Sequence, residues 1–600
     1  MEGQKQPHPN FSAMGVGQNV EGLPSQLWIK FQKQSVFAEF TPFIVSLASG
    51  RLELETFCKY IAQDVYFLRA FVQAYDMAED CADDDDAKAG ICYLRNWALE
   101  EMKMYDLSMK EWGVDLAKES SPNPVTLKYT DFLVATASGK FEGVKDPAKI
   151  ATPFEKIKLA AYTLGAMTPC MRLYAFLGKK LQSCLDPAET SHPYKKWIDG
   201  YASESFEAVA VQTEEMLDKL SISLTGEELK VVERLYHQAL NLLIEFLSAQ
   251  PIVHRTVVPF ARMQEPAERH LVIFSDFDLT CTRFDSSAIL AEISILIAPK
   301  ANPSGPENPI VPENPIVPEN PIAPENPIVP ENPIARKSSA DLRNSWDVIS
   351  RQYTEEHEQC IESIMPSEIV ETFNHKGLCK ALERFSDFEK QANARVIESG
   401  VLKGLDLEGI KRAGERLLLQ DGCVGFFQQL VKKKEELNAD IHILSYCWCG
   451  DLIRSAFSSG GLNVLNVHSN EFAYEESVST GEILQMVGSP MDKLQNFKEI
   501  LKNCNEDCKN LSVYVGRSVG DLLCLLEADV GIVFGSNPTL RRVGSQFHIS
   551  FVPLFPALVK KQKEFVEGDL PIWKGLTGTL YTVSSWEEIH AFILGLYNHL

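Results

Sequence analysis

The sequence lacks an excess of positive charge, and this absence excludes two classes of partner. Lysine and arginine number 58 against 82 aspartates and glutamates, which gives a formal net charge of −24. Nucleic acids and anionic membrane surfaces bind basic patches, so we expect neither as a partner. The sequence also lacks any apolar run close to the roughly 20 residues that span a bilayer, which argues against a membrane segment.

Two further absences concern the cellular compartment. The N-terminal region has no signal-peptide core and no Arg-rich presequence character, since its first arginine is Arg51. The 14 cysteines form no evident disulfide or zinc framework. Cys447 with Cys449, and Cys504 with Cys508, are close pairs without a second pair at zinc spacing. These features predict a cytoplasmic protein with reduced thiols.

A length of 600 residues predicts a multidomain protein, because one core rarely serves so long a chain. Helical periodicity runs through residues 25–255, and strands alternate with helices in 269–600. The remaining segments are a flexible N-terminus, 1–24, and a linker, 256–268.

From Pro306 to Ala335 the motif Pro-Glu-Asn-Pro-Ile-Val/Ala occurs five times. Two prolines in every six residues exclude a helix and favour extended or disordered chain. We interpret the repeat as a tolerated loop insertion, with a proline-rich ligand as the alternative.

The segment from Val272 to Thr280 is an apolar run that ends in Asp276-Phe277-Asp278-Leu279-Thr280. A strand that delivers two carboxylates to one turn favours a bound cation between them. This arrangement suits phosphoryl transfer, in which one aspartate attacks phosphorus and the other handles the leaving-group proton. An Asx-capped helix after a plain strand is the alternative interpretation.

Three more polar groups follow predicted elements further along the chain. Ser445 ends the apolar run 439–444, Lys493 precedes a helical pattern, and Asp521 follows the strand-like run 511–516; a fourth strand is predicted at 529–534. Alternating strands and helices predict a parallel, doubly wound α/β sheet with ligands at the carboxyl ends of its strands. Considered alone, Ser445 is better interpreted as a helix cap and Lys493 as a solvated surface charge. Because all these groups follow one another at or beside predicted strand ends, we favour the interpretation that they share one site.

This ordered set resembles the haloacid dehalogenase (HAD) phosphatase superfamily, which implies a Rossmannoid domain with a helical cap, here about 285–435. The resemblance makes Asp276 the nucleophile and Asp278 the general acid and base. It implies that Ser445 and Lys493 bind the phosphoryl group. It also implies Mg²⁺ as the cofactor, with Asp276, Asp278 and Asp521 as its ligands.

One position departs from the family pattern. The acidic motif usually reads Gly-Asp-Ser-x-x-Asp, whereas this chain has Gly516-Arg517-Ser518-Val519-Gly520-Asp521. A guanidinium cannot ligate a metal and repels one nearby. The substitution puts metal affinity and phosphatase rate in question, and leaves open a weakened or regulatory module.

The helical half contains polar residues in apolar surroundings. Leu52 to Tyr75 has one apolar helical face, and Asp64 lies within it. A buried carboxylate needs a hydrogen-bond partner or a ligand. Cys170 follows Pro169, which can open a helix kink, and Tyr174 lies one turn later. A buried cysteine alone is more often inert packing.

Several segments occur together in a fixed order: Gln63-Asp64-x-Tyr66-Phe67-Leu68, Lys128-Tyr129-Thr130, Thr168-Pro169-Cys170 with Tyr174, His192-Pro193-Tyr194-x-x-Trp197-Ile198 with Tyr201, and Glu245-Phe246. This set resembles the TenA family, which implies an all-α, haem-oxygenase-like bundle acting on thiamin breakdown products. The resemblance makes Cys170 the nucleophile and Glu245 the proton donor and acceptor. Asp64 would bind the pyrimidine.

The resemblance also assigns an aromatic lining to this pocket. Tyr129, Tyr174 and Tyr201 would orient Cys170 or stack on the substrate ring. Phe67 stands where many relatives have tyrosine, which keeps the stacking surface and loses a hydroxyl.

TenA followed by a HAD phosphatase is the arrangement of plant bifunctional thiamin-salvage proteins. It implies small-molecule substrates: aminopyrimidines for one half and thiamin monophosphate for the other. It also implies homo-oligomers through the TenA half, and mitochondrial targeting for a longer isoform. The alternatives are a single-activity TenA hydrolase, a phosphatase of other small phosphomonoesters such as flavin mononucleotide, and a binding scaffold without turnover.

Overall fold

The computed structural model describes residues 22–111, 121–140, 153–187, 191–263, 265, 267–299, 337–366, 371–463, 465–504, 509–565 and 573–596. The proline-rich repeat and most of the predicted flexible N-terminus lie outside these ranges. The chain forms two compact units, and the boundary between them falls between His254 and Arg255.

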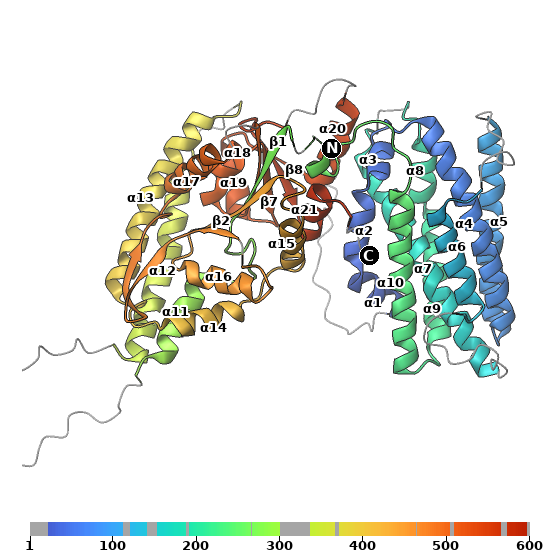
Figure 1. Cartoon of the computed structure of the whole chain (residues 1–600), viewed down its shortest axis with the longest axis horizontal. Coiled ribbons are helices and arrows are strands. Elements are labelled where there is room, and N and C mark those ends of the chain that lie inside the picture. Colours follow the sequence, from blue (N-terminus) through green and yellow to red (C-terminus); the bar gives the residue numbers. More distant parts are fainter. Residues whose placement is uncertain are drawn as a thin grey trace, which may run out of the picture. The chain divides into compact units, whose positions relative to one another are not determined.

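The first unit is all-helical. Its described helices are α1 (Leu23–Lys30), α2 (Gln32–Glu39), α3 (Pro42–Ala48), α4 (Leu54–Cys81), α5 (Asp85–Glu111), α6 (Pro124–Ala137), α7 (Pro153–Cys184), α8 (Lys195–Ala202), α9 (Glu204–Ser221) and α10 (Gly226–Ser248). The long helices run side by side as a bundle (Figure 1), with α7 packed against α4, α9 and α10.

Helix α4 confirms the helix predicted from Leu52 to Tyr75. Its buried face includes Phe57, Tyr60, Phe67 and Phe71, and Asp64 is buried among them. Helix α7 continues past Pro169 to Cys184. The bundle therefore places Asp64 and Cys170 on two long helices that pack against each other.

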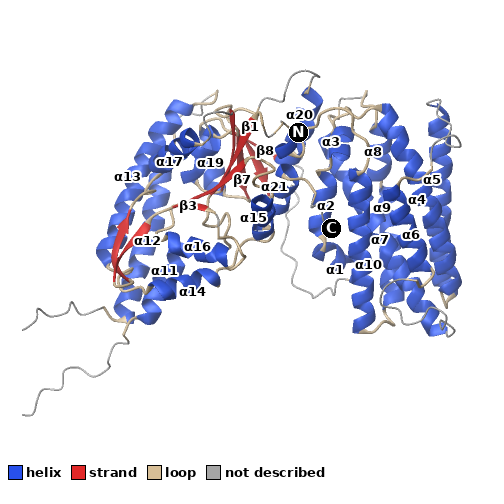
Figure 2. Cartoon of the chain, viewed as in Figure 1, coloured by secondary structure: helices blue, strands red, loops and turns tan. Residues whose placement is uncertain are grey.

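The second unit contains a parallel sheet. Its described strands are β1 (Arg269–Ser275), β2 (Ala439–Leu444), β3 (Asn466–His468), β4 (Glu471–Glu475), β5 (Val478–Leu484), β6 (Lys509–Gly516), β7 (Val530–Phe534), β8 (Ser550–Pro553) and β9 (Thr579–Val583). Seven of them form one sheet in the order β3-β2-β1-β6-β7-β9-β8, and every neighbouring pair is parallel. Figure 2 draws the strands in red, with helices around them in blue.

The helical elements described in this unit are η2 (Phe260–Arg262), α11 (Ser286–Ile297), α12 (Ser339–Ile364), α13 (His375–Ser399), α14 (Leu407–Glu415), α15 (Cys423–Lys432), α16 (Gly450–Ser458), α17 (Pro490–Asn503), η3 (Val519–Asp521), α18 (Leu522–Glu527), α19 (Pro538–Gln546), α20 (Leu554–Glu564) and α21 (Trp586–Ile593). The four strands predicted from the sequence are β1, β2, β6 and β7, so the predicted α/β sheet is confirmed.

Strands β1 and β6 lie at the point where the strand order changes direction. The chain proceeds from β1 through β2 to β3 on one side, then returns to β6 and continues to β7 on the other. Ligands of open α/β sheets bind beside such a point, at the carboxyl ends of the strands. The ends of β1 and β6 are therefore the expected place for a site.

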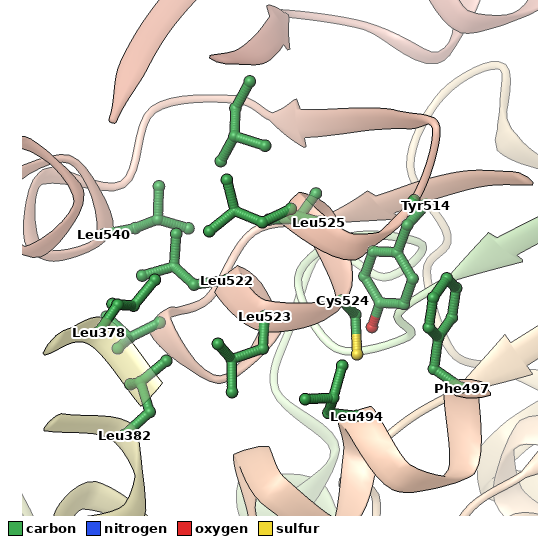
Figure 3. Close-up of a cluster of buried hydrophobic side chains, with 14 of the residues drawn as sticks. Leu378, Leu382, Leu494, Phe497, Tyr514, Leu522, Leu523, Cys524, Leu525 and Leu540 are labelled. Atoms are coloured by element: carbon green, nitrogen blue, oxygen red, sulfur yellow. The ribbon is translucent and has the colours of Figure 1, made fainter. Parts of the chain in front are cut away.

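An apolar cluster supports this end of the sheet. Leu522 and Leu523 of α18 lie beside Leu378 and Leu382 of α13 (Figure 3), and all four side chains are buried. The cluster also includes residues of α17 and β6. Because α17 carries Lys493 and β6 leads to Asp521, this packing fixes the elements that position these two predicted site residues.

The described chain between β1 and β2 contains α11 to α15, and a separate hairpin pairs β4 with β5. The backbone N–H of Ser339, at the start of α12, donates to the carbonyl of Pro299 just after α11, at 2.9 Å. Helix α15 lies within the predicted cap range, yet Phe426 on it packs against Trp586 of α21, with ring centroids 5.5 Å apart. No helix among the described residues is both long and apolar enough to cross a bilayer.

Candidate functional site

The first candidate site lies where β1 ends. The backbone N–H of Asp276 donates to the carbonyl of Val515 on β6, 2.9 Å away, so the sheet pairing extends to the aspartate itself. Leu279, two residues past Phe277, has a positive φ of 58°, which turns the chain sharply after the pair of aspartates. Asp276 is buried and Asp278 is half-buried.

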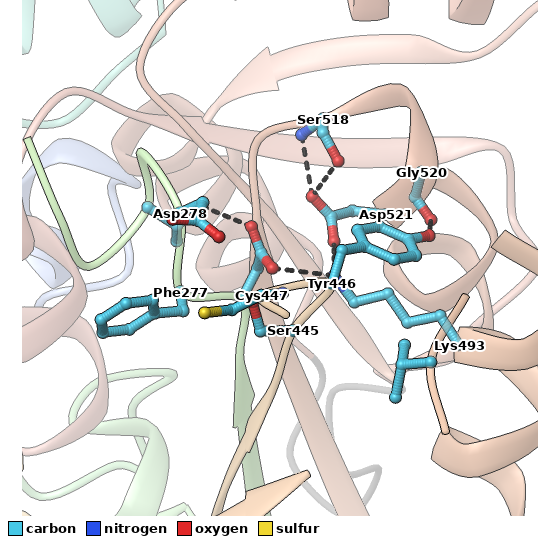
Figure 4. A network of polar contacts seen from close by, with 12 residues as sticks. Phe277, Asp278, Ser445, Tyr446, Cys447, Lys493, Ser518, Gly520 and Asp521 are labelled. Carbon is cyan, nitrogen blue, oxygen red and sulfur yellow. Dashed lines mark hydrogen bonds and ion pairs between the residues drawn. The ribbon is translucent and has the colours of Figure 1, made fainter. Parts of the chain in front are cut away.

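Lys493 joins two carboxylates at this end of the sheet. It is fully buried in the first turn of α17, and its Nζ donates to Asp276 Oδ1 at 2.8 Å and to Asp521 Oδ1 at 2.7 Å. Burial acts to lower the pKa of Lys493, but the two carboxylates outweigh it and raise that pKa above its usual value. Lys493 is therefore a charged ammonium fixed between Asp276 and Asp521, and Figure 4 shows it with Asp521 and Tyr446.

Asp521 is held by several donors besides Lys493. Tyr514 donates its hydroxyl to Oδ1 at 2.9 Å, and Ser518 donates its N–H and hydroxyl to Oδ2 at 2.8 and 2.7 Å. The N–H of Arg517 adds a contact to Oδ2 at 3.0 Å. Burial acts to raise the pKa of Asp521, but Lys493 and Ser518 hold it below its usual value.

The two aspartates of the turn have raised pKa values. Burial, with the charge of Asp521, raises the pKa of Asp276 to about 6, while Lys493 opposes the shift. Burial, with the charges of Asp285 and Asp276, raises the pKa of Asp278 well above its usual range. Asp278 also accepts the N–H of Ser286 at 2.7 Å. A carboxyl that stays protonated near neutral pH is suited to act as a general acid.

Ser445 follows β2, the strand beside β1. It is fully buried, its N–H donates to the His468 carbonyl at 3.0 Å, and its Oγ accepts the N–H of Cys447 at 3.1 Å. Figure 4 draws it in the same close-up as Asp278 and Lys493. Its role in binding a phosphoryl group stays a prediction.

The donor set at this site suits a magnesium ion through two carboxylates. Mg²⁺ in phosphoryl-transfer sites commonly uses one or two carboxylates and takes its remaining ligands from water and phosphate. Asp276 and Asp278 supply hard oxygen atoms, although Lys493 binds Asp276 Oδ1 and Ser286 donates to both oxygens of Asp278. Asp521 is more heavily bonded, with two donors on Oδ1 and three on Oδ2. Arg517 Nη1 lies 3.5 Å from the Leu279 carbonyl, so its guanidinium stands close to the turn.

Among the described residues, the one group of three metal-binding side chains whose ligand atoms lie within 4.8 Å of one another is His270, Asp440 and Cys504. Asp276, Asp278 and Asp521 do not form such a group. Asp521 as a metal ligand stays a prediction.

Sequence reasoning missed two residues of this site. The Lys493 ammonium lies 4.2 Å from the ring centroid of Tyr446, whose hydroxyl donates to the Gly520 carbonyl at 2.9 Å. Ser286 binds Asp278 through its N–H and hydroxyl. Tyr446 directly follows Ser445, so its place next to the serine at the end of a predicted strand could have identified it as a site residue.

The second candidate site lies inside the helical unit, around Cys170. Cys170 is buried, and burial followed by the charge of Asp64 raises the pKa of its thiol well above the usual range. The thiol is therefore neutral before a substrate enters. Tyr60, Tyr129 and Tyr174 lie near it: burial raises the pKa of each hydroxyl, and a charge on the Cys170 sulfur would raise it further.

Tyrosine hydroxyls link the helices around this thiol. Tyr60 donates to Tyr174 at 3.1 Å, and Tyr105 bonds to Tyr201 at 2.6 Å. The Tyr129 hydroxyl is buried and has no hydrogen-bond partner among the described residues. An unsatisfied buried hydroxyl is rare and is accounted for when a ligand supplies the partner.

Phe67 packs among other aromatic rings, and its role in stacking on a substrate stays a prediction. Its ring centroid lies 4.5 Å from that of Tyr129 and 6.3 Å from that of Phe246 on α10. The structure thus brings Phe67 and Tyr129 together within the bundle. Tyr60 and Tyr105 were not identified from the sequence, since their contacts join helices distant along the chain.

Glu245 lies at the margin of this cluster. Lys128 donates to both of its oxygens, at 2.9 and 2.6 Å, and no hydrogen bond among the described residues joins Glu245 to Cys170. Its neighbour Phe246 packs against Tyr60, with ring centroids 5.9 Å apart. Glu245 is therefore beside the aromatic cluster but paired with a lysine at its edge.

A cavity of about 380 Å³ adjoins the cluster. Tyr105 and Tyr201 line this cavity, whereas Cys170 is not part of the lining. Burial raises the pKa of both hydroxyls, and the charge of nearby Asp64 adds to the shift. The hydroxyl pair thus stands between the cavity and the thiol cluster. A substrate that enters from this cavity meets Tyr105 and Tyr201 before Cys170.

Replacing Asp64 with asparagine is expected to stabilise the helical unit at pH 8. Burial raises the pKa of Asp64 to about 7, against the opposing hydrogen bond from Tyr105. The folded state therefore holds a proton that the unfolded chain has lost, so stability falls as the pH rises from about 4 to about 7. An uncharged asparagine avoids this loss, and we expect a rise in Tm of about 5 °C at pH 8.

Calorimetry at two pH values checks this result. The gain should shrink towards zero at pH 4, where aspartate is itself neutral, and the exposed Asp131→Asn on α6 should change Tm little at either pH. A lower Tm for Asp64→Asn at pH 8 would contradict the assignment of a destabilising charge.

Known proteins resemble most of this chain. The TENA/THI-4/PQQC family model matches residues 34–141 and 158–251. The mitochondrial bifunctional TH2 protein of Arabidopsis thaliana is 57% identical over 579 residues, which are 96% of this chain and 90% of that protein. The aminopyrimidine aminohydrolase of Bacillus subtilis (strain 168) is 27% identical over 191 residues, 31% of this chain and 71% of that enzyme.

Among solved structures, a phospho-aspartyl intermediate analogue of phosphoserine phosphatase is similar to part of the chain. It is 17% identical, with a TM-score of 0.24, and the match covers 46% of this chain and 90% of that one.

Proposed function

Because this chain belongs to the family of the bifunctional TH2 protein of Arabidopsis thaliana, we propose that it is a bifunctional hydrolase of thiamin salvage. The helical unit hydrolyses an aminopyrimidine to hydroxymethylpyrimidine. The α/β unit releases thiamin from thiamin monophosphate. The proposal for each half is supported by one reactive group in a fixed environment: a buried thiol among tyrosines, and an aspartate held by a buried lysine.

In the helical unit, Cys170 attacks the pyrimidine carbon that carries the leaving amine. The thiol is neutral at rest, so its proton must leave as the carbon–sulfur bond forms. Glu245, which is paired with Lys128, accepts that proton and delivers it to the departing nitrogen. Glu245 then takes a proton from water, which displaces sulfur and restores the thiol. Asp64 holds the pyrimidine and Tyr129 gains the partner that its hydroxyl lacks.

In the α/β unit, Asp276 attacks phosphorus and Asp278 protonates the leaving alcohol. Lys493 binds Asp276 Oδ1, which leaves Oδ2 with one weak contact, from Thr280 at 3.3 Å, and so available for attack. Because the pKa of Asp278 is raised, its carboxyl group holds the proton that it donates to the leaving alcohol. Asp278 then accepts a proton from the water that hydrolyses the aspartyl phosphate.

A divalent metal, which we propose to be Mg²⁺, would be held by Asp276 and Asp278 and would neutralise the charge of the phosphoryl group. Lys493 supplies a second positive charge from the protein itself.

The Lys493 contact with Asp276 is the single observation that best supports the phosphatase half. Phosphate release from thiamin monophosphate and from flavin mononucleotide, each with and without Mg²⁺, tests it. Turnover of flavin mononucleotide alone would favour the alternative phosphatase. Absence of turnover with both, together with intact aminopyrimidine hydrolysis, would favour the single-activity protein in which the α/β unit is regulatory.

Replacing Arg517 with aspartate is expected to raise Mg²⁺-dependent phosphate release. The guanidinium stands beside the turn that carries Asp278 and repels a cation, whereas a carboxylate there adds a ligand. We expect the Mg²⁺ concentration for half-maximal rate to fall about tenfold, the effect of roughly 1.4 kcal/mol in binding.

A metal titration of the steady-state rate checks this expectation. The exposed Arg351→Asp on α12 is the matched control and should leave the titration unchanged. An unchanged or weaker metal response in Arg517→Asp would show that the arginine serves the site as it stands.

The partners of this enzyme are small molecules. Self-association through the helical unit and a cytoplasmic location remain predictions from the sequence. The Arabidopsis relative is named as mitochondrial, and we propose that compartment for a longer form of this protein.

A further inference from the structure

A cavity of about 320 Å³ leads from Asp278, the proposed general acid, into the cap. Asp278 and Ser286 line its inner end, and Trp346, Tyr353 and Glu389 line its cap side. Pockets that enclose small organic ligands begin at about this size. The cavity therefore has room for more than a phosphoryl group, and its cap side would meet the organic part of a phosphate ester.

The cap side of the cavity is aromatic. Trp346 of α12 and Trp448, which follows β2, are perpendicular to each other, with ring centroids 6.4 Å apart. Trp448 is fixed in orientation because its Nε1 donates to Asn393 Oδ1 at 3.0 Å. With two indoles at right angles, a planar ligand ring can stack on the face of one indole and contact the edge of the other. Such a surface favours cationic rings in particular, because the face of an indole is electron-rich.

A carboxylate stands among these rings. Glu389 of α13 accepts the Tyr353 hydroxyl at 2.9 Å, and no lysine, arginine or histidine of the described residues forms an ion pair with it. Arg395 also lines the cavity, but its guanidinium is paired with Glu356 at 2.6 Å. Burial raises the pKa of Glu389 to about 7, with the Tyr353 hydrogen bond opposing the shift. A cation that enters the cavity would therefore stabilise the ionised form of the Glu389 carboxylate.

We propose that Glu389, Trp346 and Trp448 form a subsite that selects phosphate esters of positively charged or protonated nitrogen heterocycles. The inference rests on the proposed phosphatase function, since it assigns the organic part of the ester to this wall. Glu389 acts as the counter-ion or hydrogen-bond acceptor, and the indoles stack on the ring. A neutral ring would leave the partly desolvated Glu389 carboxylate without a cationic partner. The free energy of binding would then be less favourable.

The test compares a cationic and a neutral ester on the full chain with Mg²⁺. The probes are thiamin monophosphate and p-nitrophenyl phosphate, and the quantity is the ratio of their kcat/KM values. Glu389→Gln should lower this ratio at least tenfold, because it removes the charge and keeps the shape. Glu383→Gln, which removes a charge from an exposed position of the same helix, should keep the wild-type ratio.

A second measurement separates binding from chemistry. Thiamin, which carries no phosphate, should inhibit p-nitrophenyl phosphate hydrolysis competitively, and its inhibition constant should rise at least tenfold in Glu389→Gln. An equal loss of kcat/KM for both esters, with an unchanged inhibition constant, would overturn the subsite and indicate a structural role for Glu389.

Failure of the proposed phosphatase function can be distinguished from failure of the subsite. If the wild-type chain releases phosphate from neither ester, the phosphatase function is rejected. Calorimetric titration with thiamin then decides the subsite: weaker binding to Glu389→Gln than to wild type supports it, and equal binding or no binding by both overturns it.

Discussion

Asp276→Asn is expected to lower phosphate release by at least about 10⁴-fold, the scale seen when a catalytic nucleophile is removed. An amide oxygen is a poor nucleophile and forms no stable phosphoryl ester, so the covalent route is closed. The fold should survive, because Lys493 keeps its second partner, Asp521, at 2.7 Å. Steady-state phosphate release from thiamin monophosphate with Mg²⁺ measures the effect.

The same preparation should hydrolyse aminopyrimidine at the wild-type rate, because Cys170 belongs to the other compact unit. Asp387→Asn, an exposed change on α13, serves as the control and should retain phosphate release. Loss of both activities in Asp276→Asn would refute independent sites. Phosphate release above a few per cent of the wild-type rate would remove Asp276 from the role of nucleophile.

Cys170→Ala should abolish aminopyrimidine hydrolysis, again by at least about 10⁴-fold. The side chain is buried among tyrosines, so alanine leaves a small cavity and no group that can attack the ring. Release of hydroxymethylpyrimidine, followed by chromatography, measures the effect. Phosphate release from thiamin monophosphate should continue at the wild-type rate.

The matched control is Cys184→Ala, at the end of the same helix α7 and outside the tyrosine cluster. It should retain both activities. Aminopyrimidine hydrolysis by Cys170→Ala near the wild-type rate would show that another group attacks the substrate. A loss of phosphate release in the same variant would indicate unfolding rather than chemistry, and circular dichroism would distinguish the two.

The fold followed closely from local patterns in the sequence. The apolar face around Asp64 predicted α4, and runs ending at Asp276, Ser445 and Gly516 predicted three parallel strands. Both patterns are local: hydrophobic periodicity predicts the buried face of a single helix, and a short apolar run predicts a single strand. Helix α15 could not be placed in this way, because its packing partner α21 lies far along the chain.

Pairings across the site were harder to foresee than its members. Lys493 was expected near the phosphate, but its bridge from Asp276 to Asp521 depends on three-dimensional geometry. The pairing of Glu245 with Lys128 joins residues 117 positions apart. Composition and spacing specify which groups a chain can offer, whereas the partner of each charge is decided by the packing of whole elements.

The hydrogen bond between Ser339 and Pro299 has an evolutionary consequence for the repeated hexapeptide. Because the described chain leaves and re-enters the cap at one point, copies of the repeat lie between ends already held together. Doubling the length of chain between two fixed ends adds only about 0.6 kcal/mol of closure entropy. Gain or loss of repeat copies by slippage during replication would therefore meet little selection from catalysis, and related genes are free to differ in copy number.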